Sequence, residues 1–311
     1  MKVLIGYDGS SYADAALNDL RLAGLPREGE ALVVSVGDVL FTPPLASHEI
    51  IEKTVPVGRL MSAIELAQEQ EMKALEEAEM LASEAVLRAQ EYLPGWKVRS
   101  KALAGAPSQE LIQEAELWKA DLIMVGSRGR SALGRLFLGS VSKTAATEAS
   151  SSVRIARRSP GKSADSPPRL VIGVDGSAGS ERAVRAVGKR VWPEGTEVRV
   201  VAVDDGTSPL RIADVTPNPE VSSTGCNEES AVRASRVVAW ALEELRAVGL
   251  RATAEIKEGD PQSVLIDEAR KRGHCVFVGS RGMGSTEGAT GLGRVSARLV
   301  TGAHYSVEVV R

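Results

Sequence analysis

Residues 121–142 read DLIMVGSRGRSALGRLFLGSVS, an apolar run that leads into glycines and then into a stretch that favours a helix. The apolar run over Asp121–Val125 is typical of a buried parallel strand, and Ser140 lies at or near the N-cap of a helix over Gly139–Ala149. Glycines let backbone N–H groups approach an anion closely, and a helix N-terminus adds partial positive charge. The pattern G-x2-G-x9-G-S over residues 126–140 therefore predicts a site for the phosphates of a nucleotide.

The chain carries its motifs twice. Residues 3–10, VLIGYDGS, recur as LVIGVDGS at 170–177, an offset of 167 (175 − 8), and VGSRG at 125–129 recurs at 278–282, an offset of 153 (279 − 126). Likewise GAP at 105–107 is matched by GDP at 259–261. Because the pairs keep the same order, we expect a duplicated domain of roughly 150 residues. We place one domain over 1–158, a linker rich in Pro and Ser over 159–168, and the other domain over 169–311.

Strand-like and helical segments alternate within each half, which predicts βαβ units and a parallel sheet covered by helices on both faces. In the first half the expected strands are Lys2–Gly6, Ala31–Val36, Lys97–Ala102, Asp121–Val125 and Val153–Arg157. The expected helices are Tyr12–Leu22, Leu60–Tyr92, Ser108–Lys119 and Gly139–Ala149. Ligands of such sheets bind beyond the carboxyl ends of the strands, and Asp8, Val36 and Gly126 all lie at those ends.

Composition narrows the class of function. The formal charge of −3 and the absence of a long basic run disfavour nucleic acid and anionic membranes as partners. No segment approaches the length of about 18 apolar residues that spans a bilayer, and the opening residues do not read as a signal peptide. The two cysteines, Cys226 and Cys275, form neither a disulfide framework nor a metal-ligand spacing. We expect a cytoplasmic protein.

These residues together resemble the universal stress protein family, in a tandem form. The shared features are an aspartate after the first strand (Asp8), Gly-x-Pro before a helix, and the glycine pattern of residues 126–140 without gaps. The resemblance implies two Rossmann-like domains, each a five-stranded parallel sheet flanked by helices. It also implies that Asp8 contacts the adenosine part of ATP, and that Val36 meets adenine through its backbone. The remaining predicted site residues lie at the strand end, in the loop and at the helix start: Val125, Gly126, Arg128, Gly129, Gly139, Ser140, Val141 and Ser142.

The residues fit these implied roles chemically. A carboxylate suits hydroxyl or amino donors, and N–H groups with serine hydroxyls suit phosphate oxygens. For the charge of the triphosphate we favour Arg128 over Arg130 and Lys143, and Lys143 is equally well interpreted as a solvated helix residue. The expected cofactor is ATP with Mg²⁺ bound to the triphosphate, although ADP and AMP share the adenosine contacts. Asp8 has the alternative role of a turn or capping residue.

The second half departs from the pattern. Ten residues instead of nine separate Gly282 from Gly293, and Arg294 stands where the first half has Ser140. Asp175, Gly279 and Gly282 remain, so the sequence leaves nucleotide binding by this half open. Arg294 either contacts a phosphate or fills the space that a phosphate would otherwise occupy. Two irregular stretches, 40–56 and 205–227, are either lids over the sites or solvated loops.

Three functions remain, in order of preference. The first is an ATP-binding regulatory protein of the stress response, with the nucleotide held mainly by the first domain. The second is a slow ATPase with at most weak hydrolysis, because no catalytic apparatus and no metal-binding carboxylate pair can be named. The third is a nucleotide-independent assembly module, in which the strands Val153–Arg157 and Val307–Arg311 pair inside the chain or with another copy. The expected assembly is accordingly a homodimer or an intramolecular pair of domains.

Overall fold

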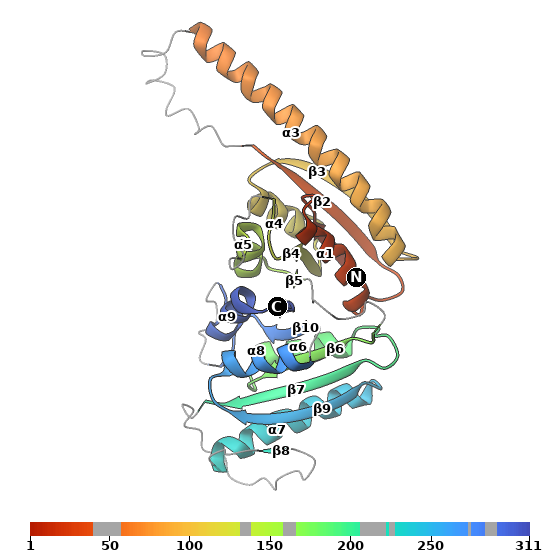
Figure 1. Cartoon of the computed structure of the whole chain (residues 1–311), viewed down its shortest axis with the longest axis vertical. Coiled ribbons are helices and arrows are strands. Elements are labelled where there is room, and N and C mark those ends of the chain that lie inside the picture. Colours follow the sequence, from red (N-terminus) through yellow and green to blue (C-terminus); the bar gives the residue numbers. More distant parts are fainter. Residues whose placement is uncertain are drawn as a thin grey trace.

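The structure, a computed structural model, describes residues 1–39, 57–130, 138–157, 166–205, 222–223, 228–272, 275–283 and 291–311. In these ranges the strands form one sheet of eleven, in the order β3-β2-β1-β4-β5-β11-β10-β6-β7-β9-β8. Ten of them form two sets of five, and the other is the two-residue β8 (Ser222–Ser223). Helices lie on both faces of the sheet (Figure 1). The predicted α/β fold with five parallel strands in each half is confirmed.

The first half follows the predicted alternation closely. Its strands are β1 (Lys2–Gly6), β2 (Glu30–Asp38), β3 (Lys97–Gly105), β4 (Leu122–Gly126) and β5 (Ser152–Ala156). Its helices are α1 (Ser11–Asp19), α3 (Val57–Tyr92), α4 (Pro107–Trp118) and α5 (Ser140–Glu148), and the 3₁₀ turn η1 (Leu20–Leu22) continues α1. Strands β2 and β3 extend beyond their predicted ends because they pair in parallel along their whole length, from Glu30↔Lys97 to Asp38↔Gly105.

The second half repeats this arrangement. Its strands are β6 (Arg169–Val174), β7 (Glu197–Asp204), β9 (Arg251–Glu258), β10 (Cys275–Gly279) and β11 (Ser306–Val310). Its helices are α6 (Ala178–Gly188), α7 (Glu228–Ala247), α8 (Pro261–Arg272) and α9 (Arg294–Gly302). Counted outward from the centre of the sheet, the order β11-β10-β6-β7-β9 corresponds to β5-β4-β1-β2-β3. The two halves are therefore related by an approximate twofold axis that passes between β5 and β11.

The first helix of each half begins in the same way. The Ser10 hydroxyl accepts a hydrogen bond from the N–H of Ala13, and that of Ser177 accepts one from the N–H of Ser180. This side-chain cap satisfies one of the N–H groups that the first helical turn leaves without a partner. The duplicated sequence DGS thus ends a strand and starts a helix in both halves.

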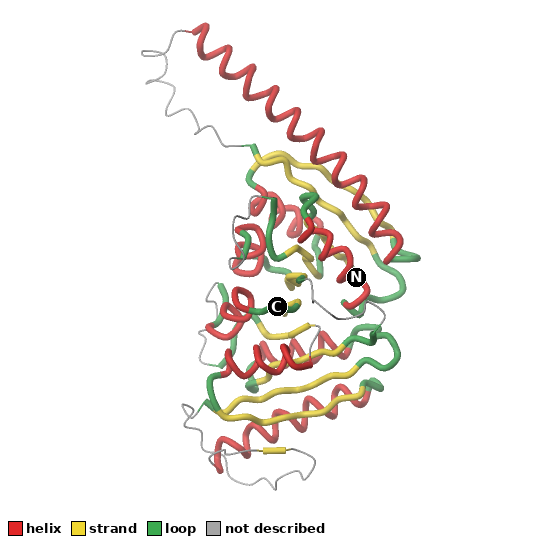
Figure 2. The backbone as a smooth tube through the Cα atoms, in the orientation of Figure 1, coloured by secondary structure: helices red, strands yellow, loops and turns green. Residues whose placement is uncertain are grey.

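The two halves share a core on one face of the sheet. Buried side chains beneath α4, α5, α8 and α9 form one cluster that includes Leu4 and Ile155 of the first half and Val276 and Leu299 of the second. On the opposite face each half has its own cluster, under α1 and α3 in the first half and under α6 and α7 in the second. Helix α3 runs past the end of the sheet (Figure 2). The continuous core makes the halves one packed body.

The halves meet through their last strands. Strands β5 and β11 pair in antiparallel fashion, with Val153 opposite Val309, Arg154 opposite Glu308 and Ile155 opposite Val307. Of the two pairings that the sequence left open, the structure therefore has the one inside the chain. The stretches proposed as lids lie outside the described residues, except for Asp205 and β8. No helix in the described ranges is both long and apolar enough to cross a bilayer.

Candidate functional site

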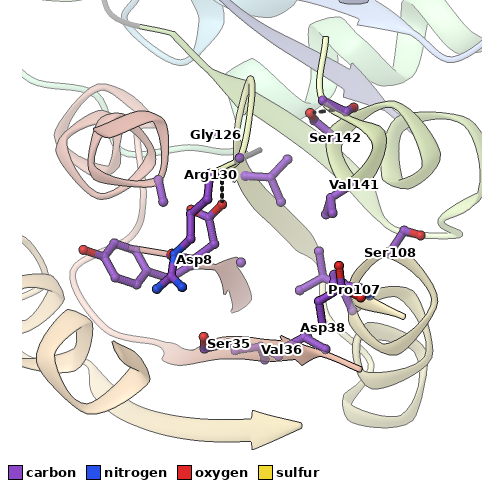
Figure 3. A pocket seen from close by; sticks show the side chains of 18 of the residues that line it. Asp8, Ser35, Val36, Asp38, Pro107, Ser108, Gly126, Arg130, Val141 and Ser142 are labelled. Carbon is purple, nitrogen blue, oxygen red and sulfur yellow. Dashed lines mark hydrogen bonds between the residues drawn. The ribbon is translucent and has the colours of Figure 1, made fainter. Parts of the chain in front are cut away.

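A pocket of about 760 Å³ opens at the carboxyl ends of β1, β2 and β4 in the first half. In Figure 3, Asp8 and Arg130 lie on one side of it, Val141 and Ser142 of α5 on the other, and Val36 and Asp38 along β2. The structure brings every residue of the predicted site to this one pocket: Asp8, Val36, Val125, Gly126, Arg128, Gly129, Gly139, Ser140, Val141 and Ser142. Their roles toward a nucleotide remain predictions.

The glycines of the loop are required by close packing. A Cβ atom at Gly126 would lie 2.4 Å from the carbonyl oxygen of Tyr12, where α1 begins. A Cβ at Gly129 would lie 2.7 Å from Oδ2 of Asp8, and one at Gly139 would lie 3.1 Å from Cα of Arg128. A Cβ at Gly126 would clash with fixed backbone, and one at Gly129 or Gly139 would force Asp8 or the loop to shift. The loop backbone therefore lies directly against both the first helix and the pocket carboxylate.

The Asp8 carboxylate ties the end of β1 to the glycine loop. Its Oδ1 accepts a hydrogen bond from the N–H of Ser10 at 3.0 Å, and its Oδ2 accepts one from the N–H of Arg130 at 3.1 Å. The first contact is that of a turn residue, and the second faces the pocket. Asp8 therefore acts as a turn residue and also lines the pocket, while its contact with a nucleotide stays a prediction.

Two arginines of the loop line the pocket. Nη1 of Arg128 donates to the Tyr12 hydroxyl at 2.7 Å, and its guanidinium lies 5.1 Å from the centre of that ring. Arg130 donates to the backbone oxygen of Asp8 and, at 2.5 Å, to Oε1 of Glu77 on α3. Lys143 is exposed and does not line the pocket. Positive charge at the pocket thus comes from the glycine loop.

The start of α5 presents backbone donors to the pocket. Gly139 is the N-cap residue, with φ −65° and ψ 153°, and no side chain caps this end. The first helical hydrogen bond runs from the N–H of Lys143 to the oxygen of Gly139, so the N–H groups of residues 140–142 precede the helical ladder. The Ser142 hydroxyl donates to the oxygens of Ser127 and Gly139, both at 3.2 Å, which fixes the loop against the helix.

Sequence reasoning missed the wall of the pocket that two other helices supply. Ala74, Glu77, Ala78 and Leu81 of α3 line it, as do Pro107, Ser108 and Leu111 of α4. The Gly-Ala-Pro motif at 105–107 was a signal for the α4 residues, because it places the start of α4 at a strand end. No comparable signal identified α3, whose position depends on Gly37: a Cβ there would lie 2.4 Å from the backbone oxygen of Ala74.

A partly exposed polar cluster holds α3 in place beside the pocket. The Tyr7 hydroxyl donates to Asp14 at 2.9 Å, and Nη1 of Arg88 on α3 donates to Tyr7 at 3.0 Å and to Asp14 at 2.5 Å. Burial, together with the hydrogen bond to Asp14, raises the pKa of Tyr7 to about 12.

This raised pKa predicts a loss of stability at alkaline pH. A group whose pKa is higher in the folded state stabilises the fold fully below its unfolded pKa, and the contribution disappears as pH rises through the folded value. For Tyr7 that window runs from 10 to about 12. We expect a tyrosinate absorbance step at the upper end of this window, at about pH 12, that Tyr7→Phe removes and Tyr12→Phe retains. An unchanged titration curve in Tyr7→Phe would contradict the assignment.

The second half repeats the scaffold of the site. Oδ2 of Asp175 accepts a hydrogen bond from the N–H of Met283 at 2.8 Å, and Oδ1 accepts one from the N–H of Ser177 at 2.9 Å. A Cβ at Gly282 would lie 2.4 Å from Oδ2 of Asp175. The Ser296 hydroxyl donates to the oxygens of Ser280 and Gly293, as that of Ser142 does in the first half.

The charges around the glycine loop and helix start of the second half differ from those in the first half. Helix α9 begins with Arg294, and Asp260 precedes α8 where the first half has Ala106. Hydrogen bonds from Ser263 lower the pKa of the Asp260 carboxyl, and the charge of Arg294 lowers it further. The second half therefore adds an ionised carboxylate and a cation at positions where the first half has alanine and serine.

Comparison with known proteins agrees with this architecture. Residues 1–157 and 168–311 each match the universal stress protein family. A universal stress protein of Mycolicibacterium smegmatis is 27% identical over 316 residues, which cover 99% of this chain and 96% of that protein. One of Methanocaldococcus jannaschii is 30% identical over 148 residues, 46% of this chain and 73% of that protein.

Solved structures show the same fold. The crystal structure of a universal stress protein from Archaeoglobus fulgidus aligns over 100% of this chain and 98% of its own, with a TM-score of 0.66 at 19% identity. Sequence matches over both halves and a fold shared along the whole length lead to one conclusion. The chain belongs to the universal stress protein family and carries two domains of that family in tandem.

Proposed function

We propose that the first half binds an adenine nucleotide, with ATP as the main ligand, and that binding serves regulation. The observation that carries this proposal is the convergence of three features on one pocket. These are the donor N–H groups at the start of α5, a glycine loop packed closely against α1 and Asp8, and the Asp8 carboxylate. ATP binding is also typical of the family.

Each part of a nucleotide finds matching chemistry in the pocket. The backbone of Val36, two residues before the end of β2, with apolar side chains such as Leu111 nearby, suits adenine. Asp8 accepts hydrogen bonds from the ribose hydroxyls, and the loop and α5 hold the phosphates. Arg128 and Arg130 add positive charge there. Mg²⁺ enters this proposal bound to the triphosphate. Among the described residues no group of three or more His, Cys, Asp or Glu side chains is arranged to hold a metal ion.

The second half is the weaker site in this proposal. Phosphates bound at the start of α9 would lie near the Asp260 carboxylate, which is within electrostatic reach of Arg294 at that helix start. The first half has Ala106 at this place and therefore no opposing charge. We accordingly expect about one nucleotide per chain, and at most weak hydrolysis. Action in the cytoplasm belongs to the same proposal.

The direct test is to identify and count the nucleotide that the natively purified chain carries. Mass spectrometry of the released ligand is followed by calorimetric titration of the stripped protein with Mg-ATP, Mg-ADP and AMP. We expect an adenine nucleotide at about one per chain. No adenine nucleotide and no heat of binding would overturn the proposal, and two equal sites would overturn the assignment to the first half.

Glu77 provides a second prediction, because it places a negative charge at the pocket and pairs with Arg130. Replacing Glu77 with glutamine removes the repulsion and releases Arg130 toward the phosphates. We expect the affinity for ATP to rise by about two- to fivefold, the range of an exposed ion pair, and that for AMP to rise less. The matched control is Glu76→Gln, an exposed neighbour on α3 that does not line the pocket. Equal gains in both variants, or equal gains for ATP and AMP, would contradict the assigned role.

A further inference from the structure

The two strands that join the halves carry opposite charges at equivalent positions. Strand β5 reads SVRIA and β11 reads SVEVV, so Arg154 and Glu308 correspond at an offset of 154 (308 − 154). In the antiparallel pairing these two residues also lie opposite each other. They therefore sit on the approximate twofold axis, where a pair of identical domains would place a residue against its own copy.

Both side chains are completely buried and are part of a network of four charges. Nη1 of Arg154 lies 3.2 Å from Oε2 of Glu308, and both side chains are 0% exposed. Nε of Arg154 donates to Oδ2 of Asp19 at 2.6 Å, and Arg190 donates to both carboxylate oxygens of Glu308. The first half supplies Asp19 and Arg154, and the second supplies Glu308 and Arg190. Negative and positive charges therefore alternate along the network, in the order Asp19, Arg154, Glu308 and Arg190.

Pairing of identical halves would break this alternation. Two first halves would bring Arg154 against Arg154 of the other copy, and two second halves would bring Glu308 against Glu308. In either case the central contact joins like charges in a fully buried site. Like charges pressed together at an interface suppress that pairing strongly, even where a matched ion pair adds little net stability.

At a separate contact between the halves, the size of the side chains distinguishes the mixed pair from a homotypic pair. The ring of Trp192 lies so close to Gly24 that a Cβ there would be 2.6 Å from Cδ2 of the indole. The backbone joins at the same place, since the N–H of Val191 donates to the oxygen of Gly24 at 3.0 Å. In the second half the counterpart of Gly24 is Val191 (191 − 24 = 167), and in the first half the counterpart of Trp192 is Leu25. Two second halves would thus press tryptophan onto a position that carries a side chain.

We propose that this interface selects its partner: the β5 edge of the first half accepts β11 of a second half and rejects another first half. The alternating charges and the Trp192–Gly24 contact act together, and both are absent from either homotypic pair. The strand edges of the two halves are consequently committed to each other. Self-association of the chain through β5–β5 or β11–β11 pairing is excluded.

The test measures which halves pair when separated halves are free to form either mixed or homotypic pairs. A protease recognition sequence is placed within residues 159–165 of the full chain, the linker is cut, and the protein is unfolded and refolded before native mass spectrometry. We expect mixed pairs to exceed homotypic pairs by more than about tenfold. In a variant with a neutral network and no indole (Asp19→Asn, Arg154→Met, Arg190→Met, Glu308→Met and Trp192→Leu), homotypic pairs appear. A statistical mixture from the unaltered sequence would overturn the proposal.

Variants of the uncut chain test the same idea if the cut halves do not refold. Glu308→Arg reproduces the arginine–arginine contact of two first halves, and Arg154→Glu reproduces the carboxylate contact of two second halves. Both are expected to lower the midpoint of denaturation below that of the neutral-network variant, which here carries the four substitutions Asp19→Asn, Arg154→Met, Arg190→Met and Glu308→Met and keeps Trp192. Gly24→Ala is expected to lower it in the unaltered background, both by the clash with the indole and by the strain of alanine at a φ of 61°, and Trp192→Leu is expected to relieve only the part that is due to the clash. Like-charge variants as stable as the neutral one, with no relief from Trp192→Leu, would overturn the proposal.

Discussion

Replacing Gly129 with alanine is expected to lower the affinity of the first half for ATP by about ten- to hundredfold, the effect of losing 1–3 kcal/mol of hydrogen bonding. The added methyl group would lie 2.7 Å from Oδ2 of Asp8, so the carboxylate has to move. Its hydrogen bond from the N–H of Arg130 is then lost, and Asp8 leaves the position where it meets the ribose. Calorimetric titration with Mg-ATP measures the change.

The duplication supplies a matched control for this experiment. At the equivalent position of the second half, a Cβ at Gly282 would lie 2.4 Å from Oδ2 of Asp175, so Gly282→Ala causes the same local displacement. If the first half holds the nucleotide, Gly282→Ala leaves affinity and stoichiometry unchanged. Thermal denaturation of both variants shows whether the fold is affected equally. Equal losses of binding would mean that the effect travels through the shared core.

Replacing Arg154 alone with methionine is expected to destabilise the chain by about 3–5 kcal/mol, the cost of breaking a buried ion pair. Asp19 would lose its cation in a site where its side chain is only 6% exposed, and Glu308 would keep Arg190 as its only cation in the network. The neutral-network variant (Asp19→Asn, Arg154→Met, Arg190→Met and Glu308→Met) removes all four charges. Apolar replacements of whole buried ion networks are often neutral or stabilising, so we expect it to lose much less.

Chemical denaturation compares these two proteins directly. The informative result is the order of stability, because the variant with four substitutions should exceed the variant with one. If Arg154→Met is the more stable of the two, the network acts as a net source of stability, and the charges contribute more than selection of the partner. Arg88→Met is a control, since that arginine pairs with Asp14 on the partly exposed side of the first half.

The spacing of apolar residues and the positions of glycines and capping residues were sufficient to predict most of the fold. The five strands and four main helices of the first half lie where apolar runs, glycines and caps placed them. The ends of β2 and β3 were wrong by two and three residues, at Asp38 instead of Val36 and Gly105 instead of Ala102. Pairing between strands keeps polar and small residues in an extended conformation there, and this pairing is not visible in a single segment.

The site was predictable as far as it is built from contiguous motifs. Strand ends and glycine spacing, together with the family resemblance, identified ten of the residues that line one pocket, because parallel strands end on the same edge of a sheet. The α3 wall was not predictable, since the contact of Gly37 with Ala74 depends on how a long helix crosses the sheet. Likewise Arg154 and Glu308 were merely charges that interrupt apolar strands. Only the register of β5 against β11 reveals that they face each other.

The pairing of β5 with β11 inside one chain also changes which combinations of residues mutation can produce at the interface. In a dimer of identical chains every substitution occurs in both subunits, so a residue on the axis always faces itself and both sites change together. Once two domains share one chain, each copy can vary independently. An arginine can then face a glutamate, and one cradle can acquire Arg294 while the other keeps Ser140. Covalent linkage has thus opened to natural selection a range of asymmetric sequences that an exchangeable homodimer has no means to encode.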